Sequence, residues 1–165
     1  MILRLSKCIL LAGVSFFFTL VVFNNLADYN ANYQFVRHIL MMDTIFPNSP
    51  SLWRSLQSST LHTLFYHSII ATEAVIALVS WWGTINLLRA IRATPAAFQQ
   101  AKSVGTVALT LACSLWLVAF LTVGGEWFLM WQSHGWNGQE EAFRMFTICA
   151  FVLVYLTLSE PEIRL

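Results

Sequence analysis

The residues most able to do chemistry in this chain lie along one face of a long apolar segment. At about 100° per residue of helix, five polar side chains fall within an arc of about 40°. They are His62, Tyr66, Glu73, Ser80 and Thr84. The other faces carry mostly Ile, Val, Ala, Leu and Trp. We predict a helix that turns this polar stripe toward the inside of a helical bundle.

Glu73 is the one charged residue within an apolar run of about residues 64–88. At about 1.5 Å per residue it lies near the middle of a bilayer, where an ionised carboxylate costs at least about 2.5 kcal/mol. We therefore expect its side chain to be buried, partnered or protonated. Two interpretations stay open: Glu73 fixes helix packing through hydrogen bonds to Ser, Thr or Tyr, or it contacts a ligand or relays protons.

A second unusual stretch, GGEWFLMWQSHGWNGQEEAFR, occupies residues 124–144. Trp127 and Trp131 are four apart, so they are predicted to stack on one helical face, as in an aromatic belt at a membrane interface. The two glycines that precede them weaken a helix or allow close backbone approach.

The same stretch predicts a pocket at the outer mouth of the bundle. Glu126 is expected to accept a bond from Arg144, Arg37 or Arg54, with tryptophan walls around it and the polar stripe beneath. An amphiphilic ligand suits such a pocket. The candidate ligand-binding residues are Glu126, Trp127, Trp131, Arg144, His62, Tyr66, Glu73, Arg37, Asp43 and Arg54.

The composition indicates a membrane protein. Of 165 residues, 58% are hydrophobic and 10% are charged, against about 25% charged in an ordinary soluble domain. Continuous apolar runs at about residues 5–23, 64–88, 104–130 and 143–158 favour helices over a barrel. We predict an all-α membrane protein, a four-transmembrane-helix bundle formed by one integral membrane domain of residues 1–165.

Positive charges predict the orientation, because they stay preferentially on the cytoplasmic side. Arg4 and Lys7 lie at the start of the first run, and Arg89, Arg92 and Lys102 lie between the second and third runs. Pro95 is expected to act as a helix breaker there, so that this segment forms a short connection. Both termini are therefore expected in the cytoplasm of a bacterium, with the protein in its inner membrane. The first run is expected to be retained, because no small-x-small cleavage site follows it.

The outward segment of about residues 26–63 is longer than a connection needs, so we expect it to form a structured cap. Residues 33–42 show helical spacing of apolar side chains, which predicts a short amphipathic helix. Pro50 is predicted to start a second helix that carries Trp53 and Leu56 on one side.

Cofactors are not indicated. His62 and His67 are five apart on one helix and cannot clamp one haem from opposite sides. A zinc or copper site built from His38, His62, His134 and Asp43 or Glu126 is chemically possible, but no ligand spacing supports it. Three cysteines without a CxxC pair do not indicate a disulfide framework. A net charge of +1 gives no nucleic-acid signal.

Three segments, FNNLADYNANYQFVRHILMMDTIFP, GGEWFLMWQS and WNGQEEAFR, together with the short last apolar run, resemble a family. It is the family of bacterial predicted small integral membrane proteins, a domain of unknown function numbered 2165. The resemblance covers nearly the whole chain. It implies a four-helix inner-membrane protein and supplies no catalytic residue.

Three functional hypotheses remain. The first is a non-enzymatic accessory or binding protein that contacts a membrane-protein partner or another copy of itself, or holds a lipid or quinone. The second is a small proton-coupled transporter that uses Glu73, although no inverted repeat is evident. The third is a membrane enzyme or redox protein that uses Glu126, Glu73 and the outer histidines.

Overall fold

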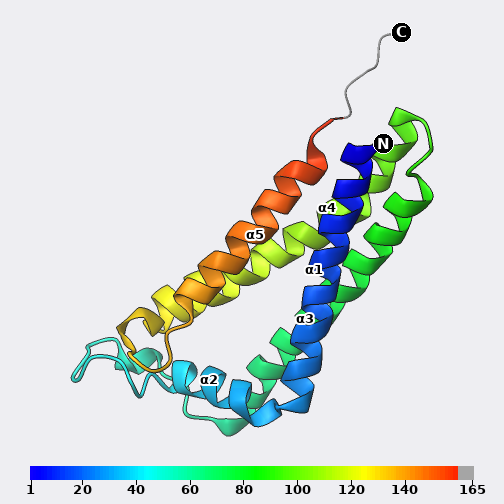
Figure 1. Cartoon of the computed structure of the whole chain (residues 1–165). Helices are drawn as coiled ribbons and strands as arrows, with labels where there is room; N and C mark the ends of the chain where they lie inside the picture. The colour runs from blue at the N-terminus through cyan, green and yellow to red at the C-terminus, as the bar shows by residue number, and fades with distance from the viewer. Residues whose placement is uncertain (160–165) are drawn as a thin grey trace.

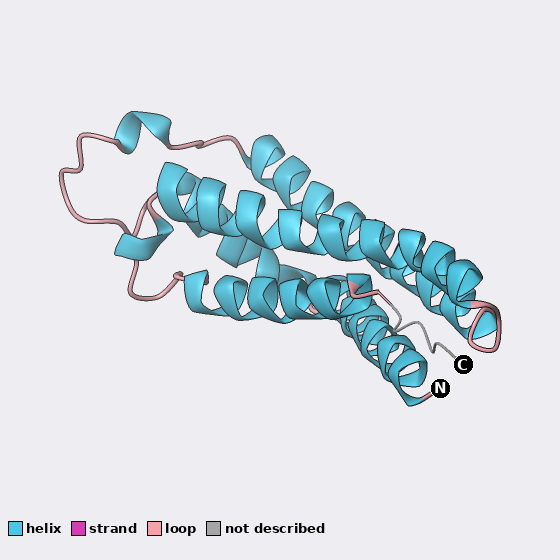
Figure 2. Ribbon diagram, turned by 90° about the horizontal axis from the view of Figure 1, so that it is seen from above, coloured by secondary structure: helices cyan, strands magenta, loops and turns pink. Residues whose placement is uncertain are grey.

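The computed structural model of the chain describes residues 1–159, within which there are five α-helices and no strand (Figures 1 and 2). The helices are α1 (Ile2–Ala27), α2 (Tyr29–Met41), α3 (Ser59–Arg89), α4 (Pro95–Ser114) and α5 (Gln139–Thr157). A π-helix, η2 (Leu115–Trp127), continues α4, and two short 3-10 helices are η1 (Leu52–Arg54) and η3 (Met130–Gln132). The last six residues of the predicted domain, 160–165, lie outside the described residues.

Three helical segments are long and apolar enough to cross a membrane: Ile2–Ala27, Ser59–Arg89 and Pro95–Trp127. They match the first three predicted spans; the first two extend beyond the predicted runs at both ends, whereas the third begins earlier than predicted, at Pro95, and ends earlier, at Trp127. The fourth predicted span, residues 143–158, falls in α5, which is a helix of 19 residues. Glu140, Glu141 and Arg144 shorten its apolar part. That α5 crosses the bilayer stays a prediction.

The helices make their closest approach at two glycines. A methyl group on Gly83 of α3 would lie 2.7 Å from the backbone nitrogen of Gly105 in α4, which is nearer than atoms can come. A methyl group on Gly105 would in turn lie 2.7 Å from Leu11 Cδ2 and 3.1 Å from Leu156 Cδ2. Small residues allow such backbone approach in membrane helices, which associate by packing. Four helices therefore meet at this level.

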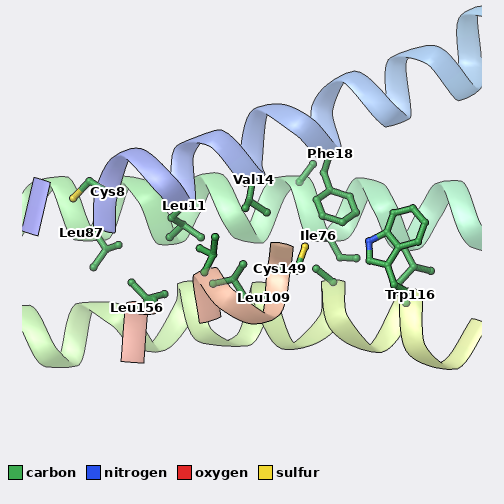
Figure 3. Packing of buried hydrophobic residues seen from close by; sticks show 14 of the residues in the cluster. Cys8, Leu11, Val14, Phe18, Ile76, Leu87, Leu109, Trp116, Cys149 and Leu156 are labelled. Carbon is green, nitrogen blue, oxygen red and sulfur yellow. The ribbon is translucent and has the colours of Figure 1, made fainter. Parts of the chain in front are cut away.

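Apolar side chains from α1 fill the space between the helices on both sides of this level. Figure 3 shows Cys8, Leu11, Val14 and Phe18 of α1 pointing toward α3, α4 and α5. Leu11 and Phe18 are fully buried. The same helix also makes polar contacts, because Ser15 Oγ and Thr84 Oγ1 are 3.2 Å apart and Trp81 donates to Thr19. The α1–α3 contact is thus antiparallel and close along most of α1.

The bundle opens toward the end opposite the N-terminus. Figure 1 shows α1 with α3 on one side and η2 with α5 on the other, separating toward the end where α2 runs across. The turn between α3 and α4 lies at the closed end, near the N-terminus (Figures 1 and 2). The predicted link between the second and third helices is shorter than expected, because Pro95 starts α4 and places Lys102 inside it.

The predicted amphipathic helix of the cap is confirmed as α2, which buries Val36 and Leu40. The second predicted helix of the cap is wrong in extent, because only Leu52–Arg54 are helical, in a single 3-10 turn. Trp53 there is 73% exposed and not packed in the bundle.

The helix that was predicted to carry Trp127 and Trp131 on one face ends between them. Leu129 adopts a left-handed conformation with φ of 55°, and the chain turns into η3. As a result Trp127 lies edge-on to Trp53, and Trp131 lies edge-on to Phe46. The predicted stacking of the two tryptophans is therefore wrong, since a continuous α-helix was assumed.

The glycine contact predicts a difference between two substitutions of the same type. Gly83→Ala forces α3 away from the α4 backbone, and we expect it to destabilise the protein by about 2 kcal/mol or more, as overpacking does. Gly13→Ala is the matched control, because nothing lies within 4 Å of the added methyl group. It should be neutral or stabilise by up to about 1 kcal/mol through helix propensity. Thermal unfolding in detergent micelles measures both, and equal effects would contradict the close contact.

Candidate functional site

The predicted polar stripe of α3 is confirmed as an inward face. Its five members, His62, Tyr66, Glu73, Ser80 and Thr84, are each no more than 2% exposed. The helix keeps them on one side because their spacing follows the helical repeat, while its other faces present apolar side chains outward. The stripe thus supplies polar groups along the whole inner side of α3.

Glu73 is held by a residue from the end of α1. Asn25 Nδ2 donates a hydrogen bond of 2.6 Å to Glu73 Oε2, and Tyr66 donates its hydroxyl to the Asn25 carbonyl oxygen at 3.1 Å. All three side chains are buried. Within residues 1–159, no side chain donates a hydrogen bond to the other carboxyl oxygen, Oε1. Both interpretations of Glu73 therefore stay open, because one carboxyl oxygen is bonded to Asn25 and the other could accept a hydrogen bond from a ligand.

The contact with Asn25 also fixes the level of Glu73 relative to α1. Asn25 follows the apolar part of α1, whose middle lies level with the contact of Ser15 and Thr84. Glu73 therefore lies level with the polar C-terminal end of α1, not with its apolar middle. The count along α3 alone missed this, because α3 extends about three turns beyond α1.

A cavity of about 430 Å³ lies in the opening of the bundle, with Glu73 in its wall. We call it the polar cavity. Its lining comes from every element around the opening: Val21, Asn24 and Asn25 of α1, Asn32, Phe35 and Val36 of α2, Tyr66, Ile69 and Glu73 of α3, Trp116 and Phe120 of η2, and Asn137, Gly138 and Glu141 at the start of α5. Four amides, two carboxyl groups and four aromatic rings thus surround one space.

An apolar cavity of about 260 Å³ adjoins the polar cavity. The two share Phe35, Val36, Ile69 and Phe120 as lining residues. Apart from Ser68, the side chains of the apolar cavity are hydrocarbon, aromatic or thioether groups of α2, α3, η2 and the following turn. A ligand that reaches both cavities would have a polar head and an apolar tail.

The π-helix η2 forms the common wall of the two cavities. Its wider turns are confirmed by bonds to the fifth residue back, Phe128 N to Val123 O and Thr122 Oγ1 to Leu117 O. Such segments occur frequently at functional sites. Here η2 places Phe120 against both cavities, and Gly124, which lines the apolar cavity, leaves room there.

Arg54 and Trp127, two further predicted site residues, line a third cavity of about 510 Å³ with Trp53. The Arg54 guanidinium lies 4.9 Å from the Trp127 ring centroid and 5.6 Å from that of Trp53. It also donates to the Trp127 carbonyl oxygen at 3.4 Å. This group of residues is at the surface, where both tryptophan side chains are exposed.

The other predicted residues do not assemble into the expected outer pocket. Glu126 and Arg144 are both exposed and line none of the three cavities. Arg37 donates to Gln34, and Asp43 pairs with His38 at 2.7 Å. His62 lies at the top of the stripe, with Nε2 2.8 Å from the Leu56 carbonyl oxygen. Trp131, as described above, packs on Phe46. The expected bond from an arginine to Glu126 is absent among residues 1–159.

Metal binding finds no support in the described part of the chain, where no three His, Cys, Asp or Glu residues gather closely enough to hold an ion. The histidines considered for such a site have other contacts. His38 stacks on Trp136 with ring centroids 4.5 Å apart, and His62 Nε2 lies 2.8 Å from the Leu56 carbonyl oxygen.

Comparison with known families gives one match. The family described as predicted small integral membrane protein (DUF2165) matches residues 3–159. The chain belongs to this family. It is therefore an integral membrane protein, in agreement with its three candidate spans. The curated proteins and the solved structures that were compared give no match.

Sequence reasoning missed most of the residues that line the polar cavity. Asn24, Asn25 and Asn32 were visible only as a polar region after the first apolar run, and Asn137 and Glu141 only as part of a family segment. A usable signal was present, however. Amides directly after a membrane span need partners, and a buried carboxyl group on another helix is one. That pairing would have joined Asn25 to Glu73.

The network around Asn25 predicts a clear contrast with its neighbour in sequence. Asn25→Ala removes the donor to Glu73 and leaves a buried carboxyl group unsatisfied, so we expect a loss of about 1–3 kcal/mol in unfolding free energy. Asn24→Ala is the matched control, because Asn24 is exposed and no hydrogen bond joins its side chain to another described residue. The unfolding free energies of the two variants are compared by denaturation in mixed micelles. Equal stability of the two variants would show that the Asn25 bond contributes nothing.

Proposed function

We propose that this member of the family is a non-enzymatic binding protein that holds an amphiphilic small molecule, of the lipid or quinone type, between its helices. The polar cavity takes the head of that molecule and the apolar cavity takes its tail. In this role the protein serves as an accessory protein of the bacterial inner membrane, where it presents or stores the molecule for a membrane partner.

One observation carries this proposal. A buried carboxyl group, Glu73, keeps one oxygen unbonded by side chains of residues 1–159 at the wall of a cavity that continues into an apolar one. Concave, mostly apolar sites with a few converging polar groups are typical of small-molecule binding. Support for an accessory role comes from the residue types: the cavity offers carboxyl groups and amides, with no nucleophile–base pair.

We also propose that four helices cross the bilayer and that both termini are cytoplasmic. Arg4 at the closed end donates to the carbonyl oxygens of Ile91 and Ala93, so the basic residues at the start of α1 and those after α3 lie at the same end. Positive charge on one side favours the cytoplasm for that end. The cavities then open toward the outer side.

Orientation is tested by cysteine labelling of intact cells with a membrane-impermeant maleimide. His134→Cys, in an exposed loop at the open end, should react, whereas Arg92→Cys at the closed end should react only after the cells are lysed. The protein without added cysteines gives the background from its own thiols, of which Cys8 and Cys149 are buried and Cys113, inside α4, is half-buried. Labelling of Arg92→Cys in intact cells would reverse the proposed topology.

Ligand binding is tested by native mass spectrometry of the protein after gentle extraction from its own membrane. We expect a stoichiometric small molecule, and Glu73→Gln should reduce its occupancy about tenfold, because a charge-assisted hydrogen bond is lost while Asn25 keeps an acceptor. Glu126→Gln is the control, since Glu126 lies outside the cavities. A wild-type protein that carries no small molecule, or equal occupancy in Glu73→Gln, would contradict the proposal.

A further inference from the structure

The charge of the polar cavity distinguishes between possible ligands. Two carboxyl groups line it, Glu73 at its buried wall and Glu141 at the start of α5, and no Lys, Arg or His does. Two arginines lie close in sequence to lining residues but do not line the cavity themselves. Arg37, next to Val36, donates to Gln34, and Arg144, three residues after Glu141, is exposed outside the cavity. Anionic heads, such as phosphates and carboxylates, would therefore meet like charge there.

Glu73 in particular lacks a positive partner. Its side chain is 2% exposed, and its one side-chain bond within residues 1–159 comes from a neutral amide. A buried carboxylate without a positive partner is costly, and a cation bound beside it offsets that cost. The buried carboxyl group is thus an acceptor whose natural complement is a positively charged donor.

Aromatic rings complete the surroundings expected for a cation. Phe35, Tyr66, Trp116 and Phe120 contribute rings from three different elements to the same cavity. The faces of such rings attract ammonium groups, and sites of this kind recognise methylated amines. The side-chain amides of Asn24, Asn32 and Asn137 also line the cavity and add neutral polar groups, although the Asn137 oxygen already accepts from the Gln139 backbone N–H.

The adjoining apolar cavity indicates what the cation is attached to. It carries almost no polar surface, and exposed side chains such as Val118 and Phe65 form part of its wall, so it reaches the surface that faces lipid. A hydrocarbon chain can enter from the bilayer there. The head then passes between Phe35 and Phe120, which line both cavities.

We infer that the ligand is a cationic amphiphile whose ammonium group lies between Glu73, Glu141 and the aromatic rings of the polar cavity, with its hydrocarbon chain in the apolar cavity. The inference rests on the proposed binding function and narrows it to one class of head group. It requires no reaction, since the ligand is bound and released unchanged.

The test uses three probes with the same chain: dodecylammonium, dodecanol and dodecanoate. Saturable binding is measured for the full-length protein in phosphatidylcholine nanodiscs, with empty nanodiscs subtracted for partitioning into lipid. We expect one dodecylammonium per chain, with dodecanol about tenfold or more weaker, because hydrogen bonds to charged groups are stronger than those between neutral groups. Dodecanoate should bind most weakly.

Substitutions locate the binding site. Glu73→Gln and Glu141→Gln should each lower the affinity for dodecylammonium about tenfold and leave that for dodecanol unchanged, since only the charge is removed. Glu141 is exposed at the start of a helix, so its variant folds even if Glu73→Gln does not. Glu140→Gln is the matched control, because its side chain, one residue earlier, does not line the cavity.

The outcomes separate the two proposals. Equal affinity for dodecylammonium and dodecanol would keep the binding function and overturn the cationic class. Saturable binding of none of the probes would overturn both. A preference for dodecylammonium that neither Glu73→Gln nor Glu141→Gln reduces would place the cation elsewhere and also overturn the inference.

Discussion

The backbone contact between Gly83 and Gly105 sets the geometry on which the rest of the structure depends. In lipid, helices gain little from hydrophobic burial against one another, so close packing at small residues decides where they meet. Here that meeting point lies toward the closed end, and Leu11 and Leu156 are packed around it. The helices separate beyond it, and α2 with the turn after η2 covers the opening. The cavities are a consequence of this divergence.

Polar groups are treated differently at the two levels of the bundle. Toward the closed end Thr84 bonds to Ser15 and to the Ser80 carbonyl oxygen, although the buried Ser80 hydroxyl has no partner among the described residues. At the open end the residues are too far apart for full pairing, and a large acceptor such as Glu73 is only half satisfied by side chains within residues 1–159. The separation of the helices therefore both forms the cavity and leaves a carboxyl oxygen of Glu73 in its wall without a side-chain donor.

Much of this arrangement could be predicted from the sequence, and the failures have physical reasons. Helical periodicity predicted the inward stripe of α3, because burial of one face is a local property of spacing. It could not predict η2, since a π-helix uses the same apolar residues and differs only in its backbone bonds. The positions of Trp127 and Trp131 were wrong because the helix ends between them, where Leu129 takes a left-handed conformation. The pairing of Asn25 with Glu73 joins two helices, and its register depends on how they cross.

The helices differ widely in length, and the surrounding lipid must accommodate that difference. At about 1.5 Å per residue, α3 with 31 residues is about 46 Å long, whereas α5 with 19 is about 28 Å. If α5 crosses the bilayer, as we propose, a bilayer that matches the length of α3 is too thick beside α5, and thinning a bilayer has an energetic cost that grows with the mismatch. Lipids around the molecule therefore experience an uneven thickness from one flank to the other.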